Sequence, residues 1–244
     1  MTVASSTGTT SVTSETPATA APATPGPTAA SERDSRVRAA WLLPAGLITL
    51  GLTPIIANAL RRIALAVGEG SLAAAGSAAP PPAALLHTIG STVFVLLGAW
   101  QFSTRFRQRH PSWHRISGRV LIAAGALAAG TGLWLSVTVT LPAGGGVLLL
   151  AFRLLAGLAM LTGLVLGFIA ILRRNIRRHG AWMIRAYAIG LGAGTQVFTL
   201  GFGQAIFGET QVAVALLNGA GWVINLAVAE VVIRGFRRRR PRAA

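Results

Sequence analysis

The residues of this sequence best suited to chemistry are its four histidines and the arginines clustered around three of them. Two connections between apolar runs are rich in arginine, and each contains the pattern His-x-x-Trp just before the next apolar run. They are Arg105–Arg119, with His110 and Trp113, and Arg173–Arg185, with His179 and Trp182. Imidazoles titrate near neutral pH and ligate metals, so we expect any chemistry of this protein on the side of the membrane where these connections lie.

His114 and His179 are the candidate ligands of a haem. Haem iron takes axial histidines from facing helices, and the two connections lie in a weakly repeated two-helix unit that would bring both imidazoles to one depth. His87 is a third candidate, but it is the only histidine in the outer half of the apolar segments. A divalent metal held by the histidine pair and Glu230 is the other option, because imidazole and carboxylate suit several such ions. Either cofactor would make the protein an electron carrier.

A polar stripe on the segment 83–104 supports a different class of function. The stripe consists of His87, Ser91, Gly98, Gln101 and Arg105. Their spacings of 4, 7, 3 and 4 residues keep them on one helical face. A polar face is costly against lipid, so it either hydrogen-bonds to neighbouring helices or lines a cavity. In a cofactor-free transporter or assembly factor, it would line a pathway or a lipid-like ligand pocket. Its partners there would be Arg153, Gln204, Asn218 and Asn225.

Two further polar interactions are expected among the apolar segments. Glu230, near the inner end of the last segment, would complete a network with Arg119 or Arg185, unless it forms a purely structural ion pair. Arg153 lies at a depth similar to that of His87. The two would form a small anion-binding pocket, unless the arginine extends outward to the lipid headgroups.

The composition indicates a membrane protein. The 244 residues are 52% hydrophobic and 11% charged, whereas soluble domains carry about 25% charged residues. The net charge is +16, and all 22 basic residues are arginines, most of them in clusters that flank apolar runs. That distribution is typical of helix ends that face anionic lipid headgroups and not of a nucleic-acid groove. Cysteine is absent, which excludes disulfides and thiolate metal sites.

We predict an all-α integral membrane helical bundle with six transmembrane helices. Residues 1–35, rich in Ser, Thr, Ala and Pro, are expected to be a disordered head, residues 36–235 the transmembrane domain, and residues 236–244 a basic tail. Each apolar segment is long enough for the roughly 20 helical residues that cross the hydrocarbon. The segments are 39–63, 83–104, 116–141, 147–172, 181–207 and 211–233.

The arginine distribution predicts the orientation. Arginines cluster before the first segment, in 105–115, in 173–178 and after the last segment, whereas the connections 142–146 and 208–210 contain none. Basic loops stay in the cytoplasm, so both termini are expected there, in a bacterial inner membrane. Arg61 and Arg62 depart from the rule. Six helices are few for a transporter acting alone, so a homodimer is expected.

Four stretches carry a resemblance to a known family. They are His87 with Gly98-Ala-Trp-Gln-Phe102, then His114-Arg-Ile-Ser-Gly-Arg119, His179-Gly-Ala-Trp-Met-Ile-Arg-Ala-Tyr187, and Asn225 with Glu230. Over residues 40 to 235 the chain resembles domain of unknown function 2306, a family of predicted multi-pass bacterial membrane proteins. Many members have an arginine where this chain has Gln196. The resemblance implies a membrane architecture and candidate residues, but no reaction.

Overall fold

The computed structural model describes Thr2 and residues 29–68, 82–138 and 146–238. The described residues from Arg38 onward form one compact unit. Most of the predicted disordered head lies outside the described residues, but its last seven residues, 29–35, belong to a helix that begins at Ala29. The end of the basic tail and the side chains of Arg61 and Arg62 also lie outside the described residues. The described part of the chain is helical, with no strand within it.

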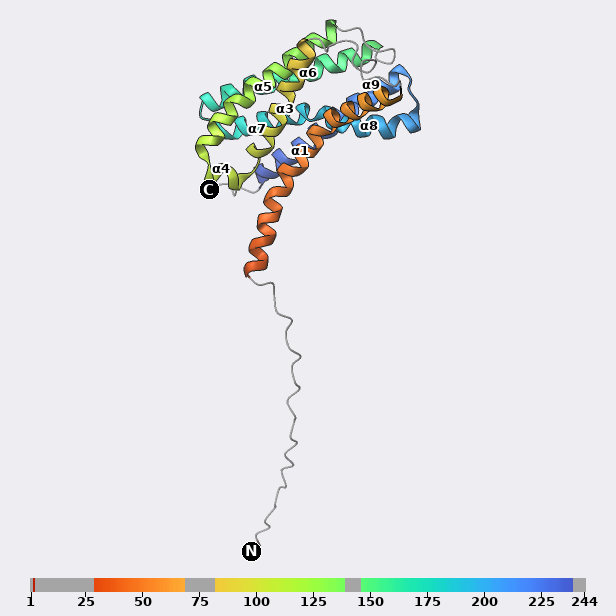
Figure 1. Cartoon of the computed structure of the whole chain (residues 1–244). Helices are drawn as coiled ribbons and strands as arrows, with labels where there is room; N and C mark the ends of the chain where they lie inside the picture. Colours follow the sequence, from red (N-terminus) through yellow and green to blue (C-terminus); the bar gives the residue numbers. More distant parts are fainter. Residues whose placement is uncertain (1, 3–28, 69–81, 139–145, 239–244) are drawn as a thin grey trace. The chain divides into compact units, whose positions relative to one another are not determined.

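Eight helices make up the described residues, and five of them confirm the predicted helical membrane bundle (Figure 1). The helices are α1 (Ala29–Gly68), α3 (Pro82–Gln101), α4 (Thr104–Arg109), α5 (Pro111–Thr138), α6 (Gly146–Leu172), α7 (Ile176–Gly190), α8 (Gly192–Phe207) and α9 (Gln211–Arg238). The stretches long and apolar enough to span a membrane are Trp41–Leu60, Pro82–Gln101, Pro111–Thr138, Gly146–Leu172 and Gln211–Gly235.

The fifth predicted span is broken, so the interpretation of residues 181–207 as one helix is wrong. The helices α7 and α8 meet at Leu191 and divide this stretch between them. Glycine is a weak helix former, and three glycines surround the break at positions 190, 192 and 194. A Cβ atom at Gly192 would overlap the Trp222 indole of α9, and one at Gly194 would overlap the Leu50 carbonyl of α1. Close packing from both sides therefore occupies the space beside the break.

Two other boundaries differ from the prediction. The helix α5 begins at Pro111 and not at residue 116, so His114 lies within its first turn and not in a connection. The helix α3 ends at Gln101, and Arg105 belongs to the short helix α4, whose first turn is capped by the Ser103 side chain. Proline suits the first turn of a helix, where its missing N–H has no partner to lose.

Four helices enclose the main core. The helix α3 packs against α5 and α7, and α6 packs against the same two helices, while α9 packs against α6, α7 and α8. Phe94 and Leu164 are almost fully buried at the centre. The Phe94 ring lies against Gly125 and Gly190, where a Cβ atom would crowd it. Small residues let helices approach closely in a membrane, so the glycines set the spacing of this bundle.

The turn between α6 and α7 contains an arginine in a conformation that usually requires glycine. Arg174 has φ 55°. The Asn175 N–H donates to the Ala170 carbonyl at 2.8 Å, and the Arg174 N–H donates to the Ile171 carbonyl at 2.9 Å. This pair of bonds is the Schellman motif, which normally has glycine at the left-handed position. A side chain there costs about 1–2 kcal/mol.

Replacing Gly98 should reveal how tightly the core is packed. A Cβ atom at Gly98 would overlap the Tyr187 ring of α7, so we expect Gly98→Ala to lower the free energy of unfolding by about 1–3 kcal/mol. Gly118→Ala is the matched control, because nothing lies within 4 Å of its added methyl group. It should leave stability unchanged or raise it by about 0.5–1 kcal/mol. Thermal unfolding in detergent measures both, and equal effects would contradict the proposed packing.

Candidate functional site

Two of the predicted site histidines come together at the end of the bundle that holds α4. His114 is in the first turn of α5 and His179 in the first turn of α7. The Asn175 side chain caps α7 by accepting a hydrogen bond from the Arg178 N–H at 3.0 Å. His114 lies near both His179 and Arg107. The first turns of two separate helices therefore place two imidazoles at the same end of the bundle.

Backbone contacts determine which ring nitrogen carries a proton in two of the imidazoles. His179 Nδ1 lies 2.9 Å from the Gly167 carbonyl oxygen of α6, and His87 Nδ1 lies 2.8 Å from the Ala128 carbonyl oxygen of α5. A carbonyl can only accept a hydrogen bond, so Nδ1 must be the donor in both rings. In the neutral imidazole, the lone pair is then on Nε2. Such bonds also orient ligating histidines in metal sites, but here they join neighbouring helices as well.

A small hydrogen-bonded group beside His114 joins α3, α4 and α5. Gln101 Nε2 donates to Ser117 Oγ at 2.7 Å, and Ser117 Oγ donates to the Trp113 carbonyl at 2.6 Å. Arg107 Nη1 donates to the Gln101 carbonyl at 2.7 Å. Burial lowers the pKa of the Arg107 guanidinium from its ordinary value, but a guanidinium stays charged at neutral pH. His114 Nδ1 is buried and has no hydrogen-bond partner among the described residues.

Ser117 and Arg107 were not predicted as members of this group. Ser117 is buried in the motif that carries the family resemblance, yet a serine in an apolar helix gives no indication of its partner. Arg107 was one arginine among several in its connection. Arg107 reaches the Gln101 carbonyl because α3 ends at Gln101 and the chain turns into the short helix α4. The apolar pattern did not predict this turn.

The polar stripe of α3 contacts other helices. His87 and Gln101 bond to α5, and Gly98 lies against Tyr187 of α7. Tyr187 Oη donates to the Val95 carbonyl at 2.8 Å, a buried contact that sequence reasoning missed. Arg105 is exposed on α4 and is not part of the stripe. The stripe therefore joins α3 to its neighbouring helices, and these contacts favour a structural role over the lining of a transport pathway.

Glu230 pairs with Arg185 and not with Arg119. Arg185 Nε donates to Glu230 Oε1 at 2.5 Å, and the Arg185 Cζ atom lies 5.0 Å from the centre of the Trp182 ring. The two charged side chains are 29% and 35% exposed. Arg119 is exposed on α5 and bonds to no described side chain. The ion pair ties the first half of the broken span to α9.

Asn225 occupies the break between α7 and α8. Its Nδ2 donates to the Ala188 carbonyl at 3.1 Å, and its Oδ1 accepts from Thr195 Oγ1 at 2.7 Å. The last carbonyls of a helix lack partners within the helix, and a side chain from α9 supplies one here. The next residue of α8 is Gln196, and its Nε2 donates to the Asn218 carbonyl at 3.0 Å. Asn225, which was predicted as a site residue, therefore joins α7 to α8 across the break.

Arg153 remains apart from the other predicted residues. It is half-buried on α6 and forms no hydrogen bond or ion pair with any residue that the structure describes. His87 bonds instead to the backbone of α5. No hydrogen bond joins His87 and Arg153 in the described part of the chain, so the anion pocket of these two residues stays a prediction.

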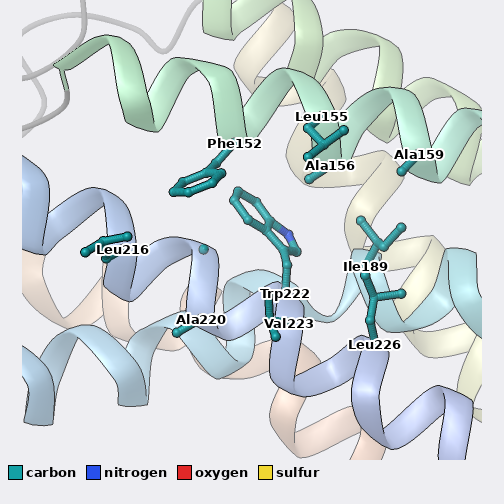
Figure 2. Close-up of a pocket in the computed structure, with 11 residues that line it drawn as sticks. Phe152, Leu155, Ala156, Ala159, Ile189, Leu216, Ala220, Trp222, Val223 and Leu226 are labelled. Carbon is teal, nitrogen blue, oxygen red and sulfur yellow. The ribbon is translucent and has the colours of Figure 1, made fainter.

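An apolar cavity of about 390 Å³ lies between α6 and α9 (Figure 2). Figure 2 shows Phe152 and Trp222 facing each other across it, with Ile189 of α7 at one side. The lining residues are Phe152, Leu155, Ala156, Ala159, Ile189, Leu216, Gly219, Ala220, Trp222, Val223 and Leu226. The only polar side-chain atom among them is the Trp222 indole nitrogen, and no histidine reaches the cavity.

The predicted three-ligand metal site is wrong. Within residues 29–68, 82–138 and 146–238, no group of three or more His, Asp or Glu side chains could hold a metal. The reason is that Glu230 lies against Arg185, so the histidine pair lacks the carboxylate that was expected to complete it.

One family model matches the chain. Its description is "Predicted membrane protein (DUF2306)", and it covers residues 84–233. This match confirms the resemblance seen in the sequence, but it begins later than residue 40. No curated protein and no solved structure matches the chain.

The Arg185–Glu230 pair should contribute modestly to stability. Both side chains are partly solvated, so we expect Glu230→Gln to lower the free energy of unfolding by about 1 kcal/mol or less. Glu209→Gln is the control, because Glu209 is exposed in the turn between α8 and α9. Thermal unfolding at low and high salt measures the effect, which should shrink as salt screens the charges. A loss in Glu209→Gln as large as in Glu230→Gln would contradict a specific pair.

Proposed function

This chain belongs to the DUF2306 family of predicted membrane proteins, and from its geometry we propose that it is a cofactor-free membrane carrier of an apolar, lipid-like molecule. The observation that carries the proposal is the cavity between α6 and α9. Its volume lies within the range of small-molecule sites, about 300–1,000 Å³. Its lining offers almost no hydrogen-bonding group, so an acyl or isoprenoid chain suits it and a polar metabolite does not.

The cavity is accessible from the side. Three of its large apolar lining residues are exposed, namely Leu155, Leu216 and Val223. Exposed apolar side chains on a membrane helix face lipid, so a chain already dissolved in the bilayer reaches the cavity without crossing a polar barrier. The Trp222 indole N–H is the only side-chain donor among the lining residues, and it lies beside Gly192.

The position of the break supports movement of the ligand as well as binding. Ile189 and Trp222 line the cavity. Ile189 is two residues before Leu191, where α7 ends and α8 begins, and the Trp222 indole lies beside Gly192. Discontinuous helices form the substrate sites of many transporters. A ligand in this cavity therefore contacts the residues beside the break between α7 and α8.

Electron transfer is the second candidate. The observation that favours it is that His114 and His179 lie near each other, with the His179 Nδ1 bonded to a backbone carbonyl as in ligating histidines. The apolar cavity lies elsewhere and contains no histidine, so the pair and the cavity do not form one haem site. For this reason we favour the carrier.

A bacterial inner membrane, with both termini in the cytoplasm, is the proposed location. The support is the arginine distribution: α4, the start of α5 and the α6–α7 turn are basic, and the α8–α9 turn is not. Counting the α7–α8 pair as one crossing gives an even number of crossings, so the two termini share a side.

Filling the cavity should reduce ligand binding. Ala220→Leu adds apolar atoms to the cavity lining, so we expect less apolar ligand to purify with the protein and weaker labelling by a photoreactive fatty acid. Ala227→Leu is the matched control, because Ala227 is exposed on the same helix and does not line the cavity. Mass spectrometry of the purified variants measures both quantities.

Equal labelling of Ala220→Leu, Ala227→Leu and the unaltered protein would contradict the apolar-ligand proposal. The visible spectrum of the same preparations tests the cofactor-free part. A Soret band that shifts on reduction and disappears in His179→Ala would instead identify an electron carrier.

The absence of cysteine makes the orientation directly measurable. We expect Ser112→Cys, in the first turn of α5, to react with a membrane-impermeant maleimide only after the cells are opened. Glu209→Cys, in the α8–α9 turn, should react in intact cells. Both positions are exposed, so a failure to react reports sidedness and not burial. The reverse pattern would overturn the proposed orientation.

A further inference from the structure

The turn between α6 and α7 presents a compact basic surface. It consists of Arg173, Arg174, Arg177 and Arg178, which we name the arginine turn. All four side chains are exposed, and they directly follow the apolar helix α6, which ends at Leu172. This position puts their guanidinium groups at the level where hydrocarbon gives way to headgroups.

The protein itself offers these arginines little negative charge. The sequence has 22 basic and six acidic residues. Glu209 and Glu230 are the acidic residues whose side chains the structure describes. Glu230 lies against Arg185, and Glu209 is in the α8–α9 turn, one crossing away from the arginine turn. The charge of the arginine turn is therefore balanced from outside the described part of the chain.

The backbone holds the arginine turn in one shape. The two Schellman bonds close the end of α6, and the Asn175 side chain closes the start of α7. Arg174 keeps its left-handed φ of 55° at a position where glycine would fit without strain. The sequence therefore has a long, positively charged side chain at a position where the backbone conformation favours glycine.

Aromatic and charged groups continue this surface along α7. Trp182 follows Arg178 by one turn, and the Arg185 guanidinium lies over its ring. Tryptophan is enriched at the level of lipid headgroups, and guanidinium groups bind phosphate oxygens with two parallel hydrogen bonds. Arg178, Trp182 and Arg185 thus follow one another along α7, from the level of the lipid phosphates toward the level of the glycerol groups.

We propose that the arginine turn is a binding site for the phosphate headgroups of anionic phospholipids in the adjacent leaflet. The site recognises a phosphate that carries net negative charge at the membrane surface. Zwitterionic headgroups bind less well, because their own ammonium group opposes the arginines. The bound lipid is a fixed part of the protein surface, distinct from the apolar ligand of the cavity between α6 and α9.

The test distinguishes the effect of the Arg174 side chain on lipid binding from the effect of its strained backbone on stability. The full chain and Arg174→Gly are placed in nanodiscs of phosphatidylcholine alone and in nanodiscs that also contain phosphatidylglycerol. Glycine relieves the left-handed strain, so Arg174→Gly should unfold at a higher temperature than the unaltered protein in phosphatidylcholine. It should gain less from phosphatidylglycerol, which we expect to bind about fivefold more weakly for each arginine removed.

Arg115→Gln is the control, because Arg115 is exposed in the first turns of α5 and lies outside the arginine turn. It should keep the stabilisation by phosphatidylglycerol and the number of retained lipids counted by native mass spectrometry. If Arg174→Gly retains as much phosphatidylglycerol as the unaltered protein, the site is refuted. If Arg115→Gln loses as much as Arg174→Gly, the attraction is a diffuse effect of surface charge, which also overturns the proposal.

Discussion

The constraint on which this structure depends is that hydrocarbon offers no partner for a backbone N–H or carbonyl group. Continuous helices meet this constraint internally in α3, α5, α6 and α9. The break at Leu191 does not, because the end of α7 leaves carbonyls without helical partners. Asn225 donates to one of them and accepts from Thr195 in the next helix. The helix α9 therefore supplies a hydrogen-bond partner at the point where the broken helix lacks one.

The same packing explains why a cavity exists where it does. Trp222 is a large side chain of α9, and its indole lies against Gly192 beside the break. With this ring turned toward the break, α9 presents Gly219 and Ala220 to α6. Small residues on the facing surfaces usually let helices approach, but Phe152 lies against Gly219 and limits the approach. The space left between the two helices is apolar because both surfaces are.

The sequence was sufficient for the helical class and for most spans, because an apolar run of membrane length has few other structures open to it. It was not sufficient for the break, since glycines at 190, 192 and 194 were equally consistent with close packing of an unbroken helix. Glu230 was predicted to meet Arg119 or Arg185, and only the packing of α7 on α9 decides between them. The cavity could not be predicted, because it depends on how the side chains of α6 and α9 pack against each other.

The histidines are explained by the same constraint. His87 and His179 are on different helices, and each donates from Nδ1 to a carbonyl of a neighbouring helix. The carbonyls belong to Ala128 and Gly167, whose side chains are too small to shield them. Each contact therefore needs a ring on one helix and a small residue on the next. Because Nδ1 is committed to the backbone, any ligand or proton that these imidazoles accept must bind at Nε2.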